Sequence, residues 1–280
     1  MDKNLGQGAK FEPNKRLGQH FLWQKGTLRP MIEAAELKKT DLVLEIGPGQ
    51  GILTRELARV AGRVVVVEKD ARLIPILKRN MRGLNNIEII KDDVLKIENW
   101  NLIENCKLKI KNYKVVANLP YYIATRIIRE FLEAPEPPNL MVVMVQKEVA
   151  QRIVARPPRM NLLAASVQFY AEPKIIGYVP KTAFWPKPKV DAAILRIAPL
   201  IDTNRQLINA DRFFKIVRAG FSQPRKQLIN NFSQGLKMPK EKVRNWLLKN
   251  RVNPTSRGQE LSLAIWLKLA QSVKMKKAKS

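Results

Sequence analysis

The chain has 280 residues, of which 45% are hydrophobic and 27% charged, so it can build a packed core and is not wholly disordered. Lys and Arg number 51 against 24 Asp and Glu, which gives a formal net charge of +27. Such an excess is typical of proteins that bind a polyanion, because each neutralised phosphate releases condensed counterions. Residues 201–280 alone hold 18 Lys and Arg and only 4 Asp and Glu.

The single cysteine, Cys106, excludes an intramolecular disulfide framework and a thiolate zinc site. The single histidine, His20, excludes a multi-histidine metal site, so we expect no metal centre. The polar N-terminal segment has no signal-peptide pattern, and the longest apolar runs, 64–67 and 140–145, are far shorter than the ~20 residues of a membrane helix. We therefore expect a soluble, cytoplasmic protein with no membrane partner.

From residue 41 to residue 197, short apolar runs rich in branched side chains alternate with longer amphipathic stretches. The apolar runs predict strands at 42–46, 64–68, 87–91, 113–117, 140–145 and 190–197. The intervening stretches predict helices at 51–60, 71–81, 124–133 and 147–155. Alternation at this spacing favours an α/β fold, a mostly parallel Rossmann-like sheet with helices on both faces.

After residue 197 the pattern changes to helices alone. Apolar residues recur at helical spacing, which predicts helices at 212–220, 225–233, 240–250 and 262–272. We predict a domain boundary near residue 200. It separates a catalytic domain, residues 1–200, from a small, basic, all-helical domain, residues 201–280.

A glycine-rich turn, Glu45 to Gly51, follows the first predicted strand, and Glu68 ends the second. Glycines let the backbone turn tightly and approach a ligand, and an acidic residue at Glu68 can accept hydrogen bonds from ribose hydroxyls. The spacing is G-x-G-x-G rather than the G-x-G-x-x-G of a dinucleotide site. It fits a nucleoside cofactor without a pyrophosphate, for which S-adenosylmethionine is the candidate, although the turn alone is equally compatible with a purely structural role.

Two further motifs follow the third and fourth predicted strands. Asp92-Asp93 can accept a hydrogen bond from an adenine amino group, or can serve only as a turn or N-cap. Asn118-Leu119-Pro120-Tyr121 offers an amide oxygen and nearby backbone carbonyls that can accept N–H bonds from an exocyclic amine. Such bonds favour a pyramidal, nucleophilic nitrogen, and Tyr121 can stack on a flipped-out base. The other interpretation is a strand end followed by packed tyrosines.

Several motifs in order make the chain resemble the ribosomal RNA adenine N6-dimethyltransferase family from about Lys15 to Leu269. They are Leu17–Leu22, Glu45–Gly51, Val67-Glu68, Asp92-Asp93, Asn118–Tyr121, Gln146–Arg152, Val179-Pro180, Phe184–Asp191, Arg225–Asn231, Asn253–Gly258 and Leu261-Ser262. The resemblance implies a Rossmann-like S-adenosylmethionine-dependent methyltransferase domain with a helical C-terminal domain. It implies dimethylation of two adjacent adenosines near the 3′ end of small-subunit ribosomal RNA.

By this resemblance, the cofactor contacts fall on His20, Leu22, Gly47, Glu68, Asp93 and Asn118, with Gly49 in the same turn. The family usually has Asn where this chain has His20. The resemblance places Phe184 opposite Tyr121, on the other side of the target base, whereas the residues alone are also compatible with a stiff connector.

Cations on two segments are candidates for contact with RNA phosphates. They are Lys147 and Arg152 on a predicted helix of the first domain, and Arg225 and Lys226 in the helical domain. A solvated surface role is the alternative for each of these residues taken alone. We expect a monomer whose partner is ribosomal RNA or the small subunit.

Three other functions are compatible with parts of the pattern. The first is the related large-subunit ribosomal RNA methyltransferase that confers macrolide resistance, which usually has Ile at Leu119 and lacks the 225–231 and 253–261 motifs. The second is a non-catalytic RNA-binding or transcription factor on the same fold, against which the intact glycine and Asn118–Tyr121 motifs argue. The third is a nicotinamide dehydrogenase, disfavoured by the glycine spacing.

Overall fold

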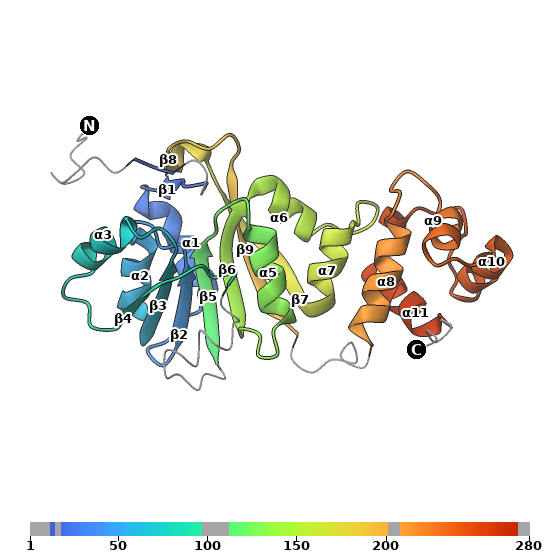
Figure 1. Ribbon diagram of the computed structural model, residues 1–280, viewed down its shortest axis with the longest axis horizontal. Helices are drawn as coiled ribbons and strands as arrows, with labels where there is room; N and C mark the ends of the chain where they lie inside the picture. Colours follow the sequence, from blue (N-terminus) through green and yellow to red (C-terminus); the bar gives the residue numbers. More distant parts are fainter. Residues whose placement is uncertain (1–11, 15–17, 97–111, 201–207, 274–280) are drawn as a thin grey trace.

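The computed structural model describes residues 12–14, 18–96, 112–200 and 208–273, and Cys106 lies outside these ranges. A seven-stranded sheet in the order β4-β3-β2-β5-β6-β9-β7 is the centre of the first part of the chain (Figure 1). Its strands are β2 (Leu42–Ile46), β3 (Arg63–Glu68), β4 (Ile87–Lys91), β5 (Tyr113–Asn118), β6 (Leu140–Gln146), β7 (Ala171–Val179) and β9 (Ala192–Pro199). All are parallel except β9, which runs antiparallel to both of its neighbours.

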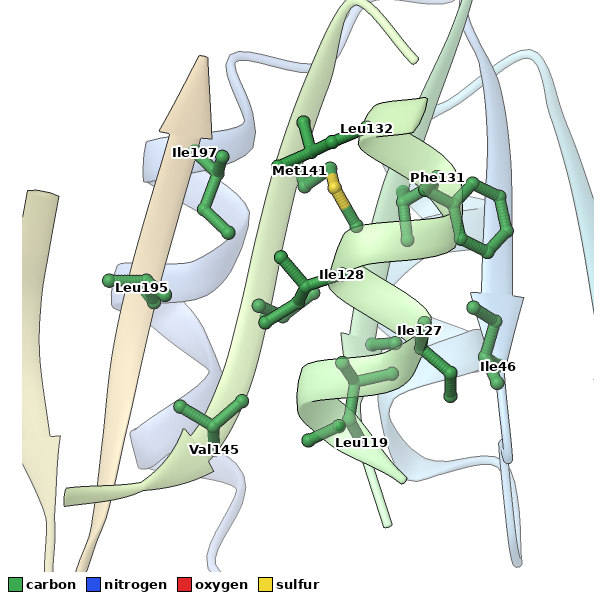
Figure 2. Close-up of a cluster of buried hydrophobic side chains, with 14 of the residues drawn as sticks. Ile46, Leu119, Ile127, Ile128, Phe131, Leu132, Met141, Val145, Leu195 and Ile197 are labelled. Carbon is green, nitrogen blue, oxygen red and sulfur yellow. The ribbon is translucent and has the colours of Figure 1, made fainter. Parts of the chain in front are cut away.

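Helices cover both faces of this sheet, as the alternating pattern predicts. On one face lie α1 (Arg29–Ala35), α2 (Ile52–Val60) and α3 (Leu73–Asn80), and on the other α5 (Ala124–Glu133), α6 (Lys147–Ile153) and α7 (Leu162–Tyr170). Helix α5 covers the sheet because one side of it is apolar. Ile127, Ile128 and Phe131 on that side are at most 2% exposed and pack against strand residues (Figure 2). Each such side chain contributes about 1.5–3 kcal/mol through burial. The predicted α/β, Rossmann-like class is confirmed.

Three elements that belong to the main sheet or pack on it were not predicted. Strand β7 contains Pro173 and Gly177 and has few buried residues, because it is an edge strand, where proline and a bulge are tolerated. Helix α7 is apolar on most sides, so it lacks the amphipathic period that marks a surface helix. It begins at Asn161, whose side chain accepts a hydrogen bond from the N–H of Ala164 at 3.0 Å. Helix α1 is short and carries Pro30 in its first turn.

Helices alone follow the sheet among residues 208–273. They are α8 (Ala210–Gly220), α9 (Leu228–Gly235), α10 (Lys240–Lys249) and α11 (Leu263–Ser272), with the 3-10 turn η4 (Gly258–Glu260) between the last two. Their core contains the fully buried Trp266 and Phe232, and it continues into α7, because the ring of Phe169 stacks on Phe213 at 4.3 Å. Helix α9 begins at Leu228, so Arg225 and Lys226 lie in the preceding turn rather than in the predicted helix.

A short ribbon stands apart from the main sheet. Strands β1 (Phe21–Leu22) and β8 (Phe184–Trp185) pair antiparallel, and they lie next to the 3-10 turns η2 (Lys25–Leu28) and η3 (Lys181–Ala183). Figure 1 shows this ribbon at one end of the sheet, above α1. Within the described ranges, no helix is long and apolar enough to cross a membrane, and no group of three or more His, Cys, Asp or Glu could hold a metal ion.

Candidate active site

One pocket lies where β2, β3, β4 and β5 end, at the carboxyl edge of the parallel strands. Open α/β sheets bind ligands at this edge, because the loops after neighbouring strands converge there. The loop that carries β1 forms another wall of the same pocket. The predicted site residues that line it are His20, Leu22, Gly47, Gly49, Glu68, Asp93, Asn118, Leu119, Pro120 and Tyr121.

The glycine turn between β2 and α2 is held tightly against its surroundings. The N–H of Gly47 donates to the carbonyl of Val67 at 2.9 Å, which ties the turn to β3. Gly49 has a φ of 58°, and a Cβ there would lie 2.9 Å from the ring of Phe21. Both the backbone conformation and the close approach therefore require glycine at this position.

Glu68, at the end of β3, is only 6% exposed and supports the turn directly. One carboxylate oxygen accepts from the N–H of Gly49 at 3.2 Å, and the other accepts from the N–H of Asp70 at 2.7 Å. Burial raises the pKa of Glu68, and these backbone N–H bonds oppose the rise. The carboxylate is thus held in one place beside the pocket, as a group that binds a ribose must be.

Asp70 anchors the loop that precedes β1. It accepts hydrogen bonds from the guanidinium of Arg72, at 2.9 and 2.6 Å, and from the amide of Gln19 at 2.8 Å. The Arg72 bonds outweigh the opposing effect of burial and lower the pKa of Asp70 to about 2. Asp70 therefore stays charged at neutral pH, and its bond to Gln19 fixes the segment that carries His20, the next residue.

A second carboxyl, Glu45 of β2, lines the pocket from a buried position. It is 2% exposed, and its Oε2 has no hydrogen-bond partner. Burial raises the pKa of Glu45 to about 8; the neighbouring Thr54 hydroxyl lowers it, and the charge of Glu68 raises it further. Glu45 therefore carries a proton at neutral pH.

Asp93 follows β4 and lines the pocket. Its carboxylate pairs with the ammonium of Lys69 at 2.8 Å and accepts from the N–H of Leu95 at 3.2 Å. Burial alone would raise the pKa of Asp93, but these partners lower it, so the group stays ionised. An ionised carboxylate can accept from an exocyclic amine.

Asn118 ends β5 with an unused acceptor. Its Nδ2 lies 3.5 Å from the carbonyl oxygen of His20, while its Oδ1 is buried and has no hydrogen-bond partner. A buried acceptor without a partner costs about 1–3 kcal/mol, and a ligand donor can recover this cost. Asn118 thus presents an acceptor to a donor that enters the pocket.

Tyr121 and His20 lie side by side, with ring centroids 5.7 Å apart. Burial, with the charges of Asp191 and Glu148, raises the pKa of Tyr121 to about 12, so the phenol is neutral and cannot act as a base at neutral pH. The Nδ1 of His20 lies 2.6 Å from the carbonyl of Pro186. Because a carbonyl only accepts, Nδ1 carries a hydrogen and donates it there.

Leu119 and Pro120 contribute through the backbone. The Leu119 side chain is 1% exposed and packs under α5 (Figure 2), so it cannot touch a ligand. The carbonyl of Pro120 accepts from the N–H of Ile123 at 3.1 Å. Leu119 therefore reaches the pocket through its backbone.

Comparison with known proteins identifies the family. Residues 10–274 match the model for ribosomal RNA adenine dimethylase. The chain belongs to the ribosomal RNA adenine dimethylase family. The resemblance inferred from the motifs is confirmed.

Curated relatives cover nearly the whole of this dimethylase-family chain. A protein of Dehalococcoides mccartyi called ribosomal RNA small subunit methyltransferase A is 42% identical, over 95% of this chain and 90% of its own. The protein of the same name from Anoxybacillus flavithermus is 39% identical, over 97% of this chain and 94% of its own.

Two solved structures share the fold of this dimethylase-family chain. A dimethyladenosine transferase from Plasmodium falciparum superposes with a TM-score of 0.73 at 28% identity, covering 89% of this chain and 96% of its own. The 23S ribosomal RNA methyltransferase ErmE gives 0.70 at 28% identity, covering 90% of this chain and 98% of its own.

Several predicted substrate residues of this family member lie outside the pocket lining. Phe184 is 3% exposed, packs in the hydrophobic core and is not among the residues that line the pocket, so its place opposite Tyr121 stays a prediction. Lys147 begins α6 with its ammonium 5.3 Å from the ring of Tyr178, and Arg152 is exposed on the same helix. Arg225 and Lys226 are exposed in the turn before α9.

Other pocket residues were missed by reasoning from single motifs. Phe21 and Tyr122 line the pocket, and Gln19 and Asp70 position its N-terminal wall. The sequence does indicate Asp70 as a site residue, because it lies two positions after Glu68 at the end of the same strand. Nothing local indicated that Gln19 reaches Asp70 across 51 positions, because the contact exists only after folding.

Proposed function

We propose that this chain transfers methyl groups from S-adenosylmethionine to the N6 amines of two adjacent adenosines near the 3′ end of small-subunit ribosomal RNA. Two methyl groups on each adenosine complete the reaction. The single observation that carries the chemistry is the buried, unpartnered Oδ1 of Asn118 at the pocket. The name shared by the relatives at 42% and 39% identity supports the small subunit as the substrate.

The pocket residues fit the cofactor. The rigid carboxylate of Glu68 suits two ribose hydroxyls, the ionised Asp93 suits the adenine amine, and the turn at Gly47 and Gly49 lets the backbone come close. His20 and Leu22 close the N-terminal side of the pocket. When bound, the cofactor supplies an electrophilic methyl group attached to a sulfonium.

On the substrate side, the chain's own groups shape the nucleophile. The target amine donates one N–H to Oδ1 of Asn118 and the other to the carbonyl of Leu119. These bonds draw the nitrogen out of conjugation with the ring and direct its lone pair at the methyl group. Tyr121 stacks on the base, and its neutral phenol takes no proton. The methylated nitrogen then loses a proton, which passes to water.

The large-subunit alternative has weaker support. ErmE shares the fold but only 28% of its sequence with this chain. The 225–231 and 253–261 motifs, expected of the small-subunit enzymes, pack together here: the N–H of Leu228 donates to Ser256 at 2.8 Å, and that of Ile229 to Pro254 at 3.2 Å. Asn231, 1% exposed, donates to the carbonyls of Gly220 and Gln223. These motifs therefore build the helical part of the chain.

We further propose a division of labour along the chain. Residues 1–200 carry the reaction, with phosphate contacts at Lys147 and Arg152, while residues 201–280 add RNA affinity through Arg225 and Lys226. We also propose that the active form is a monomer. Because the proposed substrate is ribosomal RNA, we propose that the protein acts in the cytoplasm.

The test is to incubate the protein with methyl-labelled S-adenosylmethionine and unmodified small ribosomal subunits, and then to map the modified bases. We expect label on two adjacent adenosines and none on large-subunit RNA. Asn118→Ala should lower the rate about 10²-fold or more, the scale for losing a positioned polar group. RNA affinity should change little, because most of it comes from phosphate contacts elsewhere. Label on other bases, or a near-normal Asn118→Ala rate, would contradict the proposal.

A further inference from the structure

The β1–β8 ribbon has one face turned inward and one face turned to solvent. Leu22 pairs with Phe184, and both are buried, at 7% and 3% exposed. Because side chains alternate across a strand, the next positions point the other way. Trp23 and Trp185 are accordingly 57% and 50% exposed.

Two half-exposed tryptophans on one short ribbon are unusual, because indole is a large apolar group that is highly buried in most proteins. Hydrogen bonds to the neighbouring segment 182–183 hold Trp23 in place. The indole N–H of Trp23 donates to the carbonyl of Thr182 at 3.1 Å, and its backbone N–H donates to the carbonyl of Ala183 at 3.0 Å. The ribbon therefore presents two aromatic surfaces to solvent, one anchored by the hydrogen bonds of Trp23 and the other carried by the paired strand β8.

This exposed face continues into the pocket. Phe21, the pairing partner of Trp185, lies on the same face and packs on Gly49 of the glycine turn. Phe21 lines the pocket, and so does Tyr122, which is 54% exposed. Aromatic side chains thus extend from the mouth of the pocket onto the ribbon.

The charge around the ribbon is positive. The segment 181–189 holds Lys181, Lys187 and Lys189 and no acidic residue. Lys187 and Lys189 are exposed, and none of the ion pairs among the described residues involves either of them. Aromatic faces interleaved with unpaired cations are what an unpaired nucleic-acid strand binds, by base stacking and by phosphate contacts.

We propose that the face formed by Trp23 and Trp185, with Lys187 and Lys189 beside it, binds unpaired RNA nucleotides that flank the target adenosine. This inference rests on the proposed function for the identity of the adenosine. Of the two consecutive aromatic residues in β8, Trp185 then presents its ring to RNA. Phe184 packs inward and holds the ribbon on the sheet.

The test is binding of a fluorescently labelled, unstructured single-stranded RNA of about twelve nucleotides with two adjacent central adenosines. Trp185→Leu keeps an apolar side chain without a π-face and should weaken binding about 5- to 100-fold, the range for loss of one stacked base. Trp185→Phe keeps a ring and should retain most of the affinity. Leu248→Ala, which truncates a side chain of 55% exposure on α10, is the matched control and should change nothing.

Salt dependence separates stacking from charge. Trp185→Leu should leave the slope of log affinity against log salt unchanged, because indole carries no charge. Lys187→Gln with Lys189→Gln should flatten the slope by about 0.7 for each phosphate that is no longer neutralised. Cofactor affinity, measured by calorimetry, should be unaltered in all of these variants.

Equal RNA affinity in the parent and Trp185→Leu would overturn the inference. So would a shift from dimer to monomer in Trp185→Leu, seen by light scattering with RNA affinity unchanged, because the face would then join two copies of the chain. The base-mapping assay on the parent protein is a separate readout. If the parent methylates small subunits and Trp185→Leu binds RNA with normal affinity, only this inference fails. If the parent methylates no base and Trp185→Leu loses RNA affinity, the proposed function fails.

Discussion

Glu45 and Glu68 are neighbouring buried carboxyls that the structure treats differently. Glu68 accepts two backbone N–H bonds, whereas one oxygen of Glu45 has no partner. The backbone donors favour the charged form of Glu68, which is the form that accepts hydrogen bonds from hydroxyls. Glu45 holds a proton instead, which avoids two adjacent negative charges beside the pocket.

We predict a pH dependence of stability from Glu45. Its pKa of about 8 in the folded protein lies above the ordinary value of 4.5, so the folded state keeps a proton that the unfolded chain releases. Its stabilising contribution is complete below about pH 4.5 and is lost as the pH rises towards about 8, at about 1.4 kcal/mol per unit. Glu45→Gln should therefore raise the free energy of unfolding at pH 8 by about 1–4 kcal/mol.

Urea unfolding at several pH values between 5 and about 8.5 measures this effect. The variant should show a flatter profile than the parent and should differ little from it near pH 5. Glu33→Gln, on the exposed side of α1, is the control and should follow the parent. Parallel profiles for Glu45→Gln and the parent would show that Glu45 is ionised throughout.

At the scale of elements, the packing of α8 on α11 depends on the absence of one side chain. A Cβ on Gly220, at the end of α8, would collide with the indole of Trp266, lying 2.8 Å from Cζ3, and would come within 3.3 Å of Phe232. Trp266 is fully buried and cannot move aside. Glycine is therefore required here by a neighbouring helix rather than by its own backbone.

Gly220→Ala should lower the free energy of unfolding by about 1–3 kcal/mol, the usual cost of overpacking a core. This loss exceeds the gain of about 1 kcal/mol at most that alanine brings to a helix. Gly177→Ala in β7, where a Cβ would meet nothing within 4 Å, is the matched control and should be neutral or slightly stabilising. Urea unfolding of the full chain measures both, and equal stability of the Gly220 variant and the parent would contradict the packing argument.

At the scale of the whole molecule, about half of the net charge of +27 lies in a part of the chain that does not line the pocket. The pocket is at the carboxyl edge of the sheet, whereas residues 201–280 carry a net charge of +14. Arg225 and Lys226 are exposed beside α9, and neither makes an ion pair with a described residue. They are thus available to phosphates without any cost in broken ion pairs.

Arg225→Gln with Lys226→Gln should weaken binding to small ribosomal subunits and lower the salt slope by about 0.7–0.9 for each phosphate that is no longer neutralised. Cofactor affinity should not change, because neither residue lines the pocket. Lys78→Gln with Arg79→Gln, an exposed pair on α3, removes the same charge and is the control. If both double variants weaken binding equally, the effect is one of net charge, and a local role for Arg225 and Lys226 is disproved.

Much of the fold follows from local pattern alone. Strands β2 to β6 and helix α5 were predicted nearly to the residue, because buried parallel strands are continuous apolar runs and α5 has a clear helical period. The glycine turn, Glu68, Asp93 and Asn118 were predicted to meet because all four follow parallel strands, whose carboxyl ends share one edge. Family membership followed from the order of these motifs.

Tertiary structure decided the features that depend on distant partners. It buried Phe184 and exposed Trp185, because the pairing of β8 with β1 sets which side chain faces the core. It directed Gln19 to Asp70, since that hydrogen bond joins segments with no shared local pattern. It placed α7 between the sheet and the C-terminal helices, where an all-round apolar helix is stable because both of its sides are covered.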